Sequence, residues 1–188
     1  MLLTSPLPAM AHGSIPGATV FYNGFLHAFL APAHALSLVA LALWGGGQGE
    51  ARKGLLINAL ALGLVAGALL ASTLGDPNTD PVLLSLALAC SLMVALQCMG
   101  PRWWLACVAF AVGAAVAMGS GDPAFSGMRR LSLLGGAGVG AVILFGQIAF
   151  WVDELVVRHR FRAALIAVRI VSSWMSAIAL LLVALTLR

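Results

Sequence analysis

Two histidines in an apolar stretch are the side chains of this sequence best suited to chemistry. His27 and His34 lie seven residues apart in the stretch HAFLAPAH, with Pro32 between them. In a continuous helix, seven residues turn the chain through about 700°, so both imidazoles project from one face. The two rings are then attached about 10 Å apart. That separation is too large for both to bind one ion at metal–nitrogen distances of about 2.1 Å.

The proline between the histidines allows a second arrangement. Pro32 has no N–H, so a helix passing through it loses a backbone hydrogen bond and frees the carbonyl near Ala28. Broken helices in transporters commonly use such groups to coordinate ions. Two predictions follow from the same residues. Either the histidines are successive stations on one helix face, or Pro32 unwinds the helix and brings the two rings together.

The composition places this stretch in a membrane. Hydrophobic residues make up 62% of the chain and charged residues 9%, whereas soluble domains contain about 25% charged residues. The nearly charge-free runs have the length of bilayer spans: about Asn23 to Trp44, then 54–75, 81–101, 103–121, 131–152 and 163–187, the last interrupted by Arg169. The sequence therefore predicts an all-α integral membrane bundle of six transmembrane helices in contact with the lipid bilayer.

Several functional classes are disfavoured by this organisation. Six spans leave no room for a soluble catalytic domain, and no span carries a carboxylate for proton chemistry, so we expect no enzyme and no tightly bound cofactor. Haem is disfavoured because helical haem sites usually take paired histidines from facing helices. No other predicted helix of this sequence contains a histidine. The net charge of +4 is expected to set membrane orientation rather than to bind nucleic acid.

The basic residues predict that both termini lie outside. Six of them fall on one set of connections: Arg52, Lys53, Arg102, Arg158, Arg160 and Arg162. The other side carries only Arg129, Arg130 and Arg188, and the positive-inside tendency makes that side the outer one. Residues 1–22 are then an outward arm, and residues 23–188 form the transmembrane domain. The arm contains Ala9-Met10-Ala11, a signal-peptidase-like remnant just before His12.

Packing and polar residues give further expectations. Short connections predict that consecutive helices are antiparallel neighbours. Small residues at four-residue spacing indicate close helix packing or an oligomer interface: Ala59, Gly63, Gly67 and Ala71, and Gly136 with Gly140. We expect the amides of Asn58, Gln97 and Gln147 to hydrogen-bond between helices. Arg169 is expected to reach the cytoplasmic interface or to pair with Asp153 or Glu154.

The stretch FYNGFLHAFLAPAHALSLVALALWG, preceded by AHG near the N-terminus, resembles the HupE/UreJ family. Members are small membrane proteins encoded with hydrogenase and urease systems and are regarded as nickel or cobalt permeases. Gly24, Phe25, His27 and His34 match the family frame, which reads GF-x-HP-x-x-G-x-DH. The frame's proline, glycine and aspartate are replaced here: the corresponding residues are Ala28, Ala31 and Ala33.

The resemblance implies a multi-pass protein of the bacterial inner membrane. Its expected function is secondary transport or facilitated diffusion of Ni²⁺ or Co²⁺ along a path lined by His27 and His34, with His12 and Asn23 at the outer mouth. The alternative is a non-transporting structural or accessory subunit of a larger membrane complex, in which the histidines are hydrogen-bond partners. Homo-oligomerisation is compatible with both.

Overall fold

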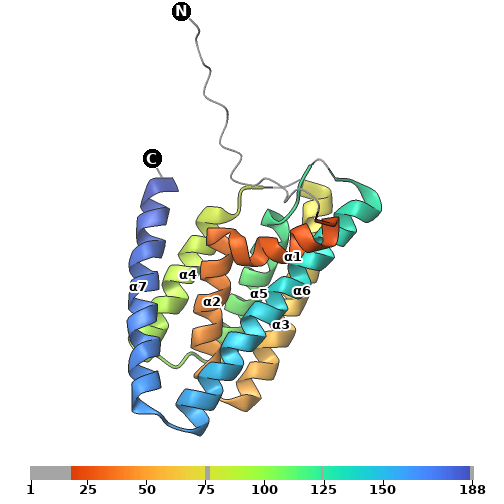
Figure 1. Cartoon of the computed structure of the whole chain (residues 1–188). Coiled ribbons are helices and arrows are strands. Elements are labelled where there is room, and N and C mark those ends of the chain that lie inside the picture. Colours follow the sequence, from red (N-terminus) through yellow and green to blue (C-terminus); the bar gives the residue numbers. More distant parts are fainter. Residues whose placement is uncertain (1–17, 75–76, 124, 187–188) are drawn as a thin grey trace, which may run out of the picture.

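The chain folds into a bundle of helices, with one helix lying across its end (Figure 1). The computed structural model describes residues 18–74, 77–123 and 125–186, and these contain no β-strand. The elements are α1 (Val20–Leu30), α2 (Pro32–Gly46), α3 (Glu50–Leu74), α4 (Asp80–Ala95), α5 (Arg102–Gly119), α6 (Gly127–Val152), a π-helical segment (Asp153–Arg158) and α7 (Arg162–Thr186). The all-α prediction is confirmed, although α1 begins inside the segment predicted as an arm.

The two ends of the bundle differ in chemistry. At one end, which we call the α1 end, α1 crosses the bundle and α7 terminates (Figure 1). At the other, which we call the ion-pair end, Lys53 Nζ lies 2.8 Å from Asp153 Oδ2 and 3.0 Å from Glu50 Oε2. The side chains of Lys53 and Asp153 are 11% and 7% exposed, so this contact ties the start of α3 to the end of α6 away from bulk water.

The predicted count of six full spans is not confirmed. Among the described residues, four helical stretches could cross a membrane by length and composition: Arg52–Thr73, Arg102–Gly119, Gly127–Arg158 and Arg162–Thr186. A fifth span is obtained if the bent pair α1 and α2 is counted as one. The remaining helix, α4, has 16 residues and ends where the chain turns at Gln97, whose φ is 56°. The architecture is that of a multi-pass membrane bundle.

Consecutive helices are not the principal neighbours, so that prediction is wrong. The most extensive contacts join α3 to α5, α1 to α6, α4 to α7 and α2 to α4, whereas α2 and α3 barely touch. Glycines explain two of these pairs. A Cβ on Gly63 would clash with the carbonyl oxygen of Phe110 in α5, and a Cβ on Gly136 would clash with that of Phe21 in α1. Close backbone approach at small residues selects helix partners in a membrane, and the short loops do not.

The polar residues of the spans also depart from expectation. Asn58, Gln97 and Gln147 are exposed on the outside of the bundle instead of lying between its helices. Arg169 Nε donates to the carbonyl oxygen of Ala95 at 3.3 Å, so Arg169 caps the last turn of α4. It pairs with no acidic side chain among the described residues, and its expected reach to the cytoplasmic interface stays a prediction. Its predicted partners are engaged elsewhere: Asp153 with Lys53, and Glu154 with Arg158 and His159.

Candidate functional site

A sharp bend separates α1 from α2. The two helix axes differ by 66°, and Ala31 between them is extended, with φ −74° and ψ 116°. A residue that precedes proline is disfavoured in the helical region, which explains the break at Ala31. Proline is well tolerated at the first position of a helix, which explains why α2 starts at Pro32. The backbone of Ala31 serves both helices: its N–H donates to His27 O at 3.0 Å, and its carbonyl accepts from Ala35 N at 2.9 Å.

The bend brings the two histidines together. The ring centroids of His27 and His34 lie 4.7 Å apart, with an interplanar angle of 68°. The second of the two arrangements allowed by Pro32 is therefore the one adopted, and the straight-helix separation of about 10 Å is wrong. His34 lies in the first turn of α2, near the α1 end of the bundle.

One ring nitrogen of His34 forms a hydrogen bond to the backbone of another helix. His34 is 2% exposed, and its Nε2 donates to the carbonyl oxygen of Val116 at 3.2 Å. A carbonyl can only accept, so Nε2 carries the proton and the lone pair of a neutral His34 is on Nδ1. Histidines that bind metal ions are commonly oriented in this way, with the second ring nitrogen donating to a carbonyl.

The end of α5 forms the wall against which His34 packs. Ser120 Oγ donates to the same Val116 oxygen at 2.6 Å, and Thr79 Oγ1 donates to the oxygen of Ala115 at 2.9 Å. A Cβ on Gly119 would lie 3.3 Å from the Cε1 and Nε2 atoms of His34 and would clash with Thr79 Oγ1. Gly119 therefore lets the imidazole and the threonine hydroxyl approach the helix end.

Helix ends of both signs meet in this region. Helix C-termini carry a partial negative charge, because their last four carbonyl groups have no partner within the helix. Two such ends lie beside the histidines: α1 ends at Leu30, and α5 ends at Gly119 with Val116 in its last turn. The first turn of α2, which begins at Pro32 and contains His34, brings the opposite partial charge to the same place. The helix ends alone therefore do not set the sign of the local potential.

No carboxylate completes the pair. Within residues 18–74, 77–123 and 125–186, no group of three or more His, Cys, Asp or Glu side chains could hold a metal ion. Ala33, which stands where the family frame has aspartate, is a buried core residue at 5% exposure. In the described part of the chain, the geometry therefore brings two imidazoles together without a group of carboxylates or thiolates beside them.

The other two predicted site residues, Asn23 and His12, are not part of the histidine pair. Asn23 lies one turn before His27 on α1, and its Nδ2 donates to the oxygen of Ala18 at 3.4 Å. His12 lies outside the described residues. Sequence reasoning missed Thr79, Ser120 and the Val116 carbonyl. Hydroxyl residues in turn-rich connections are a weak signal for a site, and nothing in the sequence identifies which backbone carbonyl a histidine will reach.

Comparison with protein-family models, with curated proteins and with solved structures finds no match to this chain.

Proposed function

We propose that this protein binds a divalent transition-metal cation, Ni²⁺ or Co²⁺, and passes it across the bacterial inner membrane as a secondary permease or facilitator. The observation that carries the proposal is the contact of His27 with His34 across the break at Ala31, with ring centroids 4.7 Å apart. The resemblance of the first apolar stretch to the HupE/UreJ family points to the same class of cargo.

The distance between the rings suits two ligands of one ion. An imidazole nitrogen lies about 1.1 Å from its ring centroid, so a metal bound at about 2.1 Å lies about 3.2 Å from each centroid. Two adjacent ligands at 90–110° then place the centroids about 4.5–5.2 Å apart. The centroids of His27 and His34 fall inside this range. Imidazole is a suitable ligand for nickel, cobalt and zinc, whereas magnesium and calcium prefer oxygen.

The position of the pair suits uptake from outside. The excess of basic residues at the ion-pair end makes that end cytoplasmic under the positive-inside tendency. The α1 end, where the histidines and the ends of α1 and α5 meet, then faces the periplasm.

A second function is favoured by the bond from His34 to Val116. That bond satisfies a carbonyl in the last turn of α5, so the histidine has a structural use that needs no metal. On this alternative the protein is a non-transporting accessory subunit of a larger membrane complex. The two functions differ in the role of His27, because the hydrogen bond to the Val116 carbonyl of α5 comes from His34.

Uptake by cells separates the two functions. Cells expressing the protein should accumulate radioactive nickel or cobalt above background, and His27→Ala should reduce this uptake to background. The matched control is His159→Ala, which removes an exposed histidine at the ion-pair end and should leave uptake unchanged. Equal uptake by all three proteins at equal membrane abundance would rule out the permease and favour the accessory subunit.

A further inference from the structure

One face of α3 carries a regular row of exposed side chains. Positions separated alternately by three and four residues along this face form what we call the α3 seam: Leu55, Asn58, Leu62, Val65 and Leu69. All five are exposed, with Leu62, Val65 and Leu69 at 64%, 60% and 65%. Alternating spacings of three and four are the pattern of helices that pair side by side as a coiled coil.

Asn58 is the polar member of this row and has no hydrogen-bond partner among the residues that the structure describes. Asn58 lies six residues beyond Arg52, the first residue of this candidate span, which corresponds to about 9 Å along the helix. Its short side chain cannot reach back to the interface, and lipid tails offer no hydrogen bond, so the amide requires a partner at that depth.

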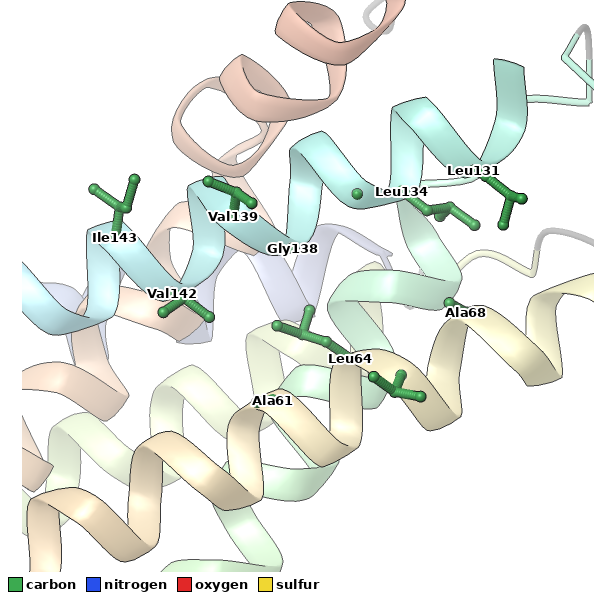
Figure 2. A pocket seen from close by; sticks show the side chains of 11 residues that line it. Ala61, Leu64, Ala68, Leu131, Leu134, Gly138, Val139, Val142 and Ile143 are labelled. Carbon is green, nitrogen blue, oxygen red and sulfur yellow. The ribbon is translucent and has the colours of Figure 1, made fainter. Parts of the chain in front are cut away.

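A shallow apolar groove runs beside the α3 seam, between α3 and α6 (Figure 2). It has a volume of about 520 Å³, and Val65 belongs to both the groove and the seam. Two glycines of α6 leave it open: a Cβ on Gly135 would meet nothing within 4 Å, and one on Gly138 would meet only Leu64 Cδ1, at 4.0 Å. The groove offers space for apolar side chains that project from a neighbouring helix.

We propose that the protein forms a parallel homodimer through the α3 seam, with the Asn58 amides of the two copies hydrogen-bonded to each other. Copies inserted in the same orientation present Asn58 at the same depth, so a two-fold axis along the membrane normal brings each amide to its equivalent. Asparagine carries both a donor and an acceptor, so two such amides satisfy one another. A single asparagine in such a row also fixes the register of the two helices.

The other exposed amide in a span lies on a different helix and close to an interface. Gln147 lies on α6, in line with the exposed side chains of Val139 and Ile143. An exposed apolar row is therefore not special to α3, and the depth of the amide separates Asn58 from Gln147. Trp151, one turn further along and 56% exposed, marks the membrane interface, which the longer glutamine side chain can reach. Gln147 is for this reason a matched control for Asn58.

The test measures self-association of the full-length protein in lipid vesicles. Donor- and acceptor-labelled copies are co-reconstituted at increasing lipid-to-protein ratios, and energy transfer reports the dimer. We expect the wild type to transfer energy and Asn58→Val to need about tenfold higher protein density for the same transfer. Asn58→Gln should retain part of the association and Gln147→Leu all of it. A monomeric wild type at every ratio, or Asn58→Val equal to wild type, would overturn the proposal.

Cysteine cross-linking gives an independent readout of the same interface. In a variant without the native cysteines, Leu62→Cys should form disulfide-linked dimers in membranes, because position 62 lies on the α3 seam. Leu70→Cys is the control, since Leu70 is also exposed but lies on another side of α3. Equal cross-linking at both positions, or cross-links only to other membrane proteins, would contradict a homodimer through the seam.

Discussion

At the residue scale, His34 and His27 share a site but not a structural role. His34 is buried and bonded to Val116 O, whereas His27 is half-buried on the crossing helix α1. His34→Ala removes a buried hydrogen bond and leaves a cavity, which should lower the free energy of unfolding by about 2–3 kcal/mol. His27→Ala should cost about 1 kcal/mol or less. Thermal unfolding in detergent measures both, and a larger loss for His27→Ala would contradict this division of roles.

Removing the side-chain hydroxyl of Ser172 is expected to maintain or raise stability, in contrast to the histidine substitutions. Its hydroxyl is fully buried in α7 and has no hydrogen-bond partner among the described residues, whereas Ser176 Oγ donates to the oxygen of Ser172 at 2.9 Å. Ser172→Ala should therefore leave stability unchanged or raise it by about 1 kcal/mol, because a buried unsatisfied hydroxyl is removed. Ser176→Ala is the matched control and should be the more destabilising of the two in the same unfolding assay. The reverse order would show that Ser172 has a polar partner.

At the element scale, the docking of α1 on α6 holds His27 beside His34. Adjacent glycines of α6 test this docking: a Cβ on Gly136 would clash with the carbonyl of Phe21, and one on Gly135 meets nothing. Gly136→Ala should lower the free energy of unfolding by about 1–3 kcal/mol and weaken metal binding, because α1 is pushed away. Gly135→Ala should change neither. Equal effects of the two substitutions would show that α1 is not held by this contact.

The elements themselves were largely predictable, but their arrangement was not. Charge-free runs located α3, α5, α6 and α7, because hydropathy and length dominate in a membrane. The partner of each helix depends on which face carries the glycines that meet another backbone, as Gly63 does, and loop length does not encode that. At the site, the sequence identified both histidines. It left their separation open, since Pro32 is compatible with a kinked helix and with a broken one.

At the scale of the whole molecule, the ion pair of Lys53 and Asp153 joins the start of α3 to the end of α6. Both side chains are nearly buried, and Lys53 also contacts Glu50. Removing one partner leaves a buried charge, so Lys53→Met should cost about 3 kcal/mol or more of stability. The double variant Lys53→Met with Asp153→Leu should recover a large part of that loss. A double variant as unstable as Lys53→Met would contradict the pairing.

The central claim is that two imidazoles on either side of a helix break bind one divalent cation. The most direct test is a titration of the purified full-length protein with Ni²⁺, followed by calorimetry, for wild type, His27→Ala, His34→Ala and the double variant. Because both rings bind the same ion, each single variant should bind at least about tenfold more weakly. The double variant should be little worse than either single one, since residues that act as a unit are not additive. Wild-type affinity in His27→Ala would contradict the claim.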